Sequence, residues 1–130
     1  MHPANVMIID DDQVTLSLLK QIVSGLVSGE ILTFSSSIKA HAFLLSEDAQ
    51  RINLMICDWQ MPSISGIKIL ETLKLKLPDC PFFMITAKPT KELVISAKRL
   101  GVDHFVAKPF VAEDLSKVLA ELLEKICPAA

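Results

Sequence analysis

Short apolar runs alternate with longer amphipathic segments along the whole chain. The apolar runs have the length of strands and occupy residues 6–9, 31–34, 52–57, 82–85 and 104–107. After each run, apolar residues recur at helical spacing over residues 13–27, 38–47, 65–77, 90–100 and from residue 112 onward. This alternation predicts parallel strands joined by right-handed crossovers. We therefore expect one α/β domain over residues 1–130, with five helices covering a five-stranded parallel sheet.

Composition narrows the class of protein. Hydrophobic residues make up 51% of the chain and charged residues 22%, which is ordinary for a globular domain. A net charge of −2 with scattered Lys and Arg gives no basis for nucleic-acid binding. We expect no membrane insertion, because no apolar stretch approaches the roughly 20 residues of a membrane span. The N-terminus lacks a signal-peptide pattern, and three cysteines without metal-ligand spacing indicate reduced thiols, so we expect a cytoplasmic protein.

Polar side chains follow four of the predicted strands at their carboxyl ends. Asp10 and Asp11 follow the first strand, and Asp58 follows the third. Thr86 follows the fourth strand, and Lys108 follows the fifth. Ligands of open parallel sheets bind beyond these ends. Carboxylates that converge there repel one another, and a divalent cation removes that repulsion. Ligation by oxygen alone favours Mg²⁺ or Mn²⁺.

The same residue types suit phosphoryl transfer. A carboxylate beside a bound cation can attack phosphorus and form an aspartyl-phosphate. The ammonium of Lys108 and the hydroxyl of Thr86 could hold the remaining phosphoryl oxygens. A structural alternative is that the acidic run at residues 10–12 caps the following helix, and we assign that role to Asp12.

The whole chain resembles the receiver domains of two-component response regulators, a family that includes single-domain chemotaxis regulators. The matching residues, in order and with matching spacing, are Asp10-Asp11, Asp58 with Met61-Pro62 and Gly66, Thr86-Ala87, and Lys108-Pro109-Phe110. The resemblance implies a flavodoxin-like three-layer sandwich with strand order 2-1-3-4-5. It also implies a cis Lys108–Pro109 peptide bond.

Metal-binding roles follow from the resemblance residue by residue. It implies that Asp58 is the phosphoacceptor, and that Asp11 and Asp58 bind Mg²⁺ (or Mn²⁺) directly. The backbone carbonyl of Gln60 would be a third ligand, and Asp10 would act mainly through a metal-bound water.

The resemblance also implies which groups contact the phosphoryl group. Lys108 and Thr86 would do so through their side chains, and Trp59 and Ala87 through backbone N–H groups. Thr86 and Phe105 would form the switch. Phe105 stands where relatives often have Tyr, and it has no hydroxyl to bond to a partner.

The implied function is phosphorelay. A sensor histidine kinase or histidine phosphotransfer protein would donate the phosphoryl group, and the domain would act as a switch, not a metabolic enzyme. The signal would pass through the face formed by the fourth helix, fifth strand and fifth helix, to an output domain or a second copy. The chain could be free-standing or part of a longer regulator or hybrid kinase.

Two functions of other classes remain as alternatives. A phosphohydrolase with an aspartyl nucleophile would use similar residues, but such enzymes usually carry an acid two positions after the nucleophile, where this chain has Gln60. A flavin-binding module would share the fold, but Asp10, Asp11 and Asp12 would repel the flavin phosphate.

Four further expectations concern where side chains lie. We expect Trp59 at the rim of the pocket, and Lys88 near the phosphoryl group, where it would alter the lifetime of the phosphate. Leu93, Ala97 and Leu100 are expected to face the sheet. The buried stripe of the last helix is predicted to be Leu115, Val118, Leu119, Leu122, Leu123 and Ile126.

Overall fold

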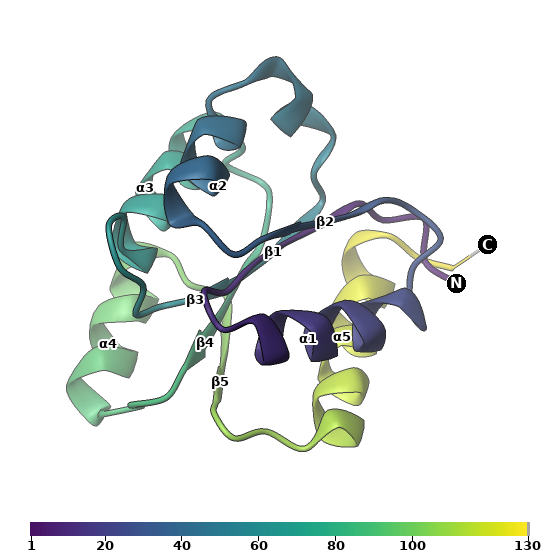
Figure 1. Ribbon diagram of the computed structural model, residues 1–130. Helices are drawn as coiled ribbons and strands as arrows, with labels where there is room; N and C mark the ends of the chain where they lie inside the picture. The colour runs from purple at the N-terminus through teal and green to yellow at the C-terminus, as the bar shows by residue number, and fades with distance from the viewer. Residues whose placement is uncertain (130) are drawn as a thin grey trace.

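Five parallel strands form one sheet between two layers of helices in the computed structural model, which describes residues 1–129 (Figure 1). The strands are β1 (Val6–Ile9), β2 (Ile31–Phe34), β3 (Leu54–Asp58), β4 (Phe82–Thr86) and β5 (His104–Ala107). Their order is β2-β1-β3-β4-β5. The flavodoxin-like arrangement and the strand order expected from the sequence are confirmed.

Side-chain caps begin most of the helices. The helices are α1 (Gln13–Ser24), α2 (Ser37–Leu44), α3 (Gly66–Lys76), α4 (Lys91–Leu100) and α5 (Ala112–Ile126), with a 3-10 helix η1 at Glu47–Arg51. Asp12, Ser36, Ser65 and Thr90 each accept a backbone N–H of the first turn that follows them. Within residues 1–129, no helix combines the length and the apolar character that crossing a membrane requires.

Two apolar cores lie on the two faces of the sheet. Successive strand residues point to opposite faces, so Ile8 and Ile56 pack with α1 and α5, whereas Met7 and Met55 pack with α2, α3 and α4. Figure 1 shows the same division, with α1 and α5 on one side of the strands. Burial on both faces explains why the central strands are apolar almost throughout.

Several expected boundaries and contacts are wrong. The first helix ends at Ser24, and Val27 instead forms a β-bridge with His2. Leu100 and Val118 were predicted to be buried but are 42% and 40% exposed. In α4 only Ala97 is fully buried, because this helix packs lightly on the rest of the molecule, so its last residue remains in solvent.

Candidate functional site

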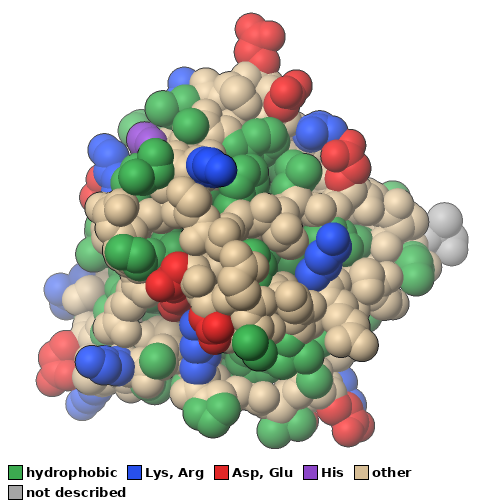
Figure 2. All heavy atoms as spheres, in the orientation of Figure 1, with side chains coloured by type: hydrophobic (Ala, Val, Ile, Leu, Met, Phe, Trp, Pro, Cys, Tyr) green, Lys and Arg blue, Asp and Glu red, His purple; other side chains and the backbone are tan. Residues whose placement is uncertain are grey.

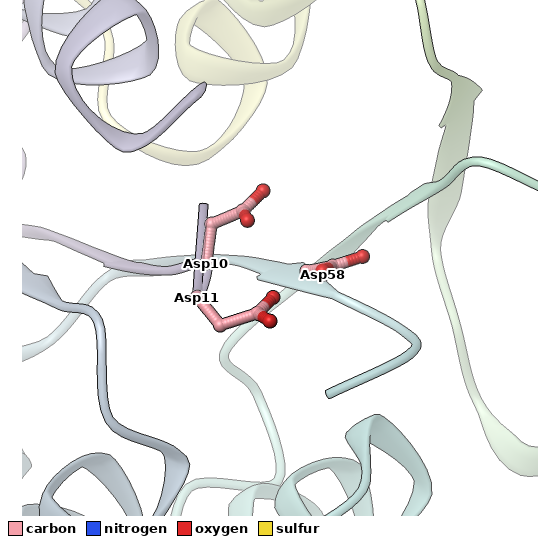
Figure 3. Close-up of side chains that lie close together, drawn as sticks. All are labelled: Asp10, Asp11 and Asp58. Carbon is pink, nitrogen blue, oxygen red and sulfur yellow. The ribbon is translucent and has the colours of Figure 1, made fainter. Parts of the chain in front are cut away.

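Three carboxylates gather where β1 and β3 end. Asp10 and Asp11 directly follow β1, and Asp58 is the last residue of the neighbouring strand β3. One oxygen from each carboxylate lies within 4.8 Å of the others. Figure 3 shows the three side chains extending from the two strand ends toward a shared space. Asp10 and Asp58 are buried, while Asp11 is exposed.

Lys108 brings one positive charge to this cluster. Its Nζ lies 2.9 Å from Asp10 Oδ2 and 3.5 Å from Asp58 Oδ2. The backbone N–H of Lys108 donates to the Thr86 carbonyl at 2.8 Å, which fixes the turn after β5 against the end of β4. The Lys108–Pro109 peptide bond is cis, as predicted.

Repulsion within the cluster is not fully compensated. Burial raises the pKa of Asp58 to about 6, the Asp10 charge adds to that rise, and Lys108 offsets only part of it. Burial disfavours the charge on Lys108, but its contacts with Asp10 and Asp58 outweigh this effect and raise its pKa. Three carboxylates and one ammonium leave the cluster negative when all are ionised.

One carboxylate oxygen of Asp10, Oδ2, lacks a hydrogen bond within the described part of the chain. Its side chain is fully buried, and Oδ1 accepts the backbone N–H of Asp12 at 2.9 Å. Oδ2 receives no hydrogen bond of good geometry from residues 1–129, so the 2.9 Å contact with Lys108 is an ion pair without a directed hydrogen bond. A buried carboxylate oxygen with a spare lone pair beside two other carboxylates is an arrangement that a hard cation or its bound water would complete. The residues therefore fit Mg²⁺ or Mn²⁺.

The third aspartate of the run has a different role. Asp12 caps α1 by accepting the Val14 N–H at 3.2 Å and the Thr15 hydroxyl at 2.7 Å. The bond from Thr15 is the main cause of a lowered pKa at Asp12. The capping expected of Asp12 is thus confirmed, and this residue lies outside the carboxylate cluster.

Thr86 lies at the end of β4, fully buried beside β3 and β5. Its Oγ1 accepts the Lys88 N–H at 3.1 Å, which leaves the hydroxyl hydrogen free to donate. No hydrogen bond of the Ala87 N–H to another group is found within residues 1–129.

Trp59 differs from both expectations made for it. Its side chain is only 5% exposed and packs edge-on against Phe82, with ring centroids 6.2 Å apart, so it belongs to the core and not to the rim. Its N–H donates to the Ile85 carbonyl at 2.8 Å. That bond occupies the amide that the resemblance assigns to the phosphoryl group, so in this structure the Trp59 N–H is not free to donate to it.

Apolar side chains surround a hollow farther along β5. Phe105 is 40% exposed and, with Phe110 and Val118, lines a hollow of about 330 Å³ between β5 and the start of α5. Figure 2 shows hydrophobic side chains along the lower margin of the molecule, where β5 leads into α5 in Figure 1. A second hollow, of about 400 Å³, opens between Lys108 and the exposed Val14 of α1.

Sequence reasoning missed one residue near the site. Ser37, at the start of α2, is buried and hydrogen-bonds to the loop between β3 and α3. In the sequence it is one of three consecutive serines before a helix, which signals a cap but does not show which serine faces inward.

Comparison with known proteins gives a consistent result. The family described as "Response regulator receiver domain" matches residues 6–120. A chemotaxis protein CheY homolog from Campylobacter jejuni is 25% identical over 120 residues, covering 91% of each chain. Response regulator SaeR from Staphylococcus aureus is 31% identical over 122 residues, which is 94% of this chain and 51% of SaeR.

Solved structures agree with this match. A response regulator receiver domain protein from Clostridium thermocellum superposes with a TM-score of 0.81 at 28% identity, covering 94% of this chain and 95% of that one. The BeF3-activated DrrB receiver domain superposes with a TM-score of 0.81 at 25% identity, covering 94% and 98%.

Proposed function

Because the chain belongs to the family of response regulator receiver domains, we propose that it accepts a phosphoryl group on Asp58 and acts as a phosphorylation-dependent switch. The observation that carries this proposal is the convergence of Asp10, Asp11, Asp58 and Lys108 at one edge of the sheet. A cluster that disfavours its own charges is costly for stability, so its presence points to a ligand that neutralises it.

The proposed reaction begins with a carboxylate oxygen of Asp58. This oxygen attacks the phosphorus of a phosphohistidine on a sensor histidine kinase or a histidine phosphotransfer protein. The O–P bond forms as the P–N bond breaks, and the imidazole nitrogen keeps the electron pair of the broken bond. Lys108, whose Nζ lies 3.5 Å from Asp58 Oδ2, is close enough to stabilise the charge on the incoming phosphoryl oxygens.

A divalent cation is part of this proposal. Bound Mg²⁺ or Mn²⁺ would supply Lewis-acid stabilisation of the phosphoryl oxygens. Asp11, Asp58 and the backbone carbonyl of Gln60 would hold it directly, and Asp10 would act through a metal-bound water. The buried Asp10 Oδ2, which lacks a good hydrogen bond within residues 1–129, supports this assignment.

Thr86 and Phe105 would convert the modification into a change of surface. The free hydroxyl hydrogen of Thr86 and the N–H of Ala87 would donate to the phosphoryl oxygens. An inward shift of Thr86 would vacate space beside β5, and Phe105 would move from its exposed position toward the sheet. The face formed by α4, β5 and α5 would then favour an active conformation.

The partners would be the phosphohistidine donor on one side and an output domain or a second copy on the other. Exposed apolar residues on the α4, β5 and α5 face, including Ile95, Phe105 and Val111, support the second contact. The domain would carry out only its own phosphorylation and dephosphorylation and would not turn over a metabolite. The free thiols of Cys57, Cys80 and Cys127 support a place in the reducing cytoplasm.

The test is incubation with Mg²⁺ and acetyl phosphate followed by intact-mass measurement. One added phosphoryl group is expected on the wild-type protein and none on Asp58→Ala. EDTA should also prevent the mass increase. An equal increase in Asp58→Ala would contradict the assignment of the phosphoacceptor.

A further inference from the structure

Ser37 is a buried polar residue with no part in the proposed reaction, and its contacts lead toward the site. Its side chain lies at the first turn of α2 and is 5% exposed. The hydroxyl donates to the Pro62 carbonyl at 2.7 Å and accepts the Ile64 N–H at 3.0 Å. One side chain therefore binds the loop that joins β3 to α3 at the two residues that flank Ser63.

That loop is also held where it begins and ends. The Trp59 N–H donates to Ile85, and the Trp59 carbonyl accepts the Gly66 N–H at 3.1 Å. A Cβ at Gly66 would lie 2.8 Å from the Cα of Trp59, so the two chain segments meet closely. The loop is thus closed at its base, and Ser37 holds its far side.

The conformation that Ser37 holds is one that the backbone disfavours. Ser63 lies between the two residues that Ser37 binds and has a φ of 70°, in the left-handed region that side chains other than glycine seldom adopt. Hydrogen bonds on both sides of such a residue are the kind of support that keeps it in place.

Gln60 lies between the contacts at Trp59 and the contact at Pro62, so the two sets of hydrogen bonds limit where its carbonyl can point. We propose that Ser37 is a positioning residue for the cation site, because it holds the loop in the form that directs the Gln60 carbonyl toward Asp11 and Asp58. This inference rests on the proposed function, in which that carbonyl binds the cation.

The attachment of α2 does not depend on Ser37 alone. His41 Nε2 and Thr72 Oγ1 are 3.0 Å apart and link α2 to α3, and the Thr72 hydroxyl donates to the Lys68 carbonyl. Since that hydroxyl hydrogen is already used, His41 donates through Nε2. We therefore expect Ser37→Ala to fold with α2 in place.

Ser36 provides the matched control. Its side chain caps the same helix by accepting the Lys39 N–H, and it makes no hydrogen bond to the β3–α3 loop. Ser36→Ala should weaken α2 without releasing the loop.

The experiment measures the dissociation constant of Mg²⁺ by calorimetric titration in wild type, Ser36→Ala and Ser37→Ala. Residues that orient metal ligands commonly contribute ~10–100-fold in affinity, and for a loop held at a distance we expect a loss of about threefold to tenfold in Ser37→Ala. Ser36→Ala should remain within about twofold of wild type, as expected for a cap that does not contact the site. Equal affinities in the two variants would overturn the inference.

A second measurement needs no variant. If Ser37 couples the loop to the cation, Mg²⁺ binding must in turn strengthen the hydrogen bonds of Ser37. Hydrogen exchange at the Ile64 N–H of wild type should therefore slow on addition of Mg²⁺, and unchanged exchange despite measured binding would overturn the inference. If wild type bound no Mg²⁺ at all, the proposed function would fail first.

Discussion

Polar residues are paired differently at the two ends of the parallel strands. We call the side of the sheet where the strands begin the amino edge, and the side where they end the carboxyl edge. At the amino edge, the Asn5 N–H donates to Asn53 Oδ1 at 2.8 Å and the Asn53 N–H donates to the Asn5 carbonyl at 2.9 Å. Asp103 Oδ2 accepts the Phe82 N–H at 2.8 Å and lies 3.3 Å from Lys74 Nζ. These polar groups have partners that complete the ends of the strands.

At the carboxyl edge, the polar groups do not all have such partners. Asp10 Oδ2 has no good hydrogen bond within residues 1–129, and Asp58 has a raised pKa because it is buried near Asp10. The Asp103 carboxylate at the amino edge therefore contributes to the fold, whereas the charge of Asp58 at the other edge, whose pKa is raised, reduces stability when the group is ionised. The sheet positions both sets of polar groups, but within residues 1–129 it is at the carboxyl edge that a buried side-chain oxygen, Asp10 Oδ2, lacks a hydrogen bond.

The largest expected difference between the edges is in phosphoryl acceptance. Asp58→Asn should lose all labelling by acetyl phosphate in Mg²⁺, because its amide oxygen is not a nucleophile of comparable strength. Asp103→Ala should be labelled to the wild-type extent as long as it is folded. Intact mass measures the labelling of both variants. Loss of labelling in a folded Asp103→Ala would show that the two edges do not differ in their role in phosphoryl acceptance.

The same two variants should change stability in opposite directions. At neutral pH in EDTA, Asp58→Asn removes a disfavoured charge and should raise the free energy of unfolding by about 1–2 kcal/mol. Asp103→Ala leaves the Phe82 N–H without its acceptor and should lower that free energy by about 1–3 kcal/mol. Urea unfolding monitored by circular dichroism measures both. A lower free energy of unfolding in Asp58→Asn than in wild type would show that Lys108 already offsets the charge of Asp58.

The pH dependence of stability should show the same effect at Asp58. The pKa of Asp58 is about 6 in the folded protein against a usual value of 3.8, so the folded state binds more protons between these values. The stabilisation from this group is complete below about pH 4 and is lost as pH rises through about 6. In EDTA, the unfolding free energy of wild type minus that of Asp58→Asn should therefore become more negative as the pH rises across this range. Saturating Mg²⁺ should reduce the dependence of this difference on pH. A difference that does not change with pH in EDTA would contradict the raised pKa of Asp58.

Much of the fold could be predicted from the sequence because its signals are local. Each strand is a short apolar run, and Asp10, Asp58 and Lys108 lie at or just beyond the carboxyl ends of such runs. Once parallel pairing is inferred, these ends must lie at one edge of the sheet. Strand positions therefore place the carboxylates and Lys108 at one edge, and the strand order implied by the family resemblance, which the structure has, brings the ends of β1 and β3 together.

What could not be predicted depends on contacts between distant segments. Trp59 was placed at the rim because it follows Asp58, but its direction depends on the close approach of Gly66 and on Phe82. The hydrogen bond of Ser37 joins residues 25 positions apart, and nothing in either segment alone indicates it. Val118 fits the helical period of α5, yet its neighbours leave it beside an open hollow.

The smallest expected effect comes from Lys88, whose N–H bonds Thr86 Oγ1 at the carboxyl edge. We expect its exposed side chain to hinder the approach of water to the phosphoryl group, so Lys88→Ala should raise the autodephosphorylation rate constant. The increase should be about twofold to fivefold, or about 0.4–1 kcal/mol in the barrier, as for other surface charges. The control is Lys76, which lines a separate hollow of about 380 Å³ at the amino edge, and Lys76→Ala should leave the rate unchanged. Decay of the phosphorylated protein, followed by intact mass after removal of acetyl phosphate, measures the rate. Equal rates for wild type and Lys88→Ala would show that the Lys88 side chain does not reach the phosphoryl group.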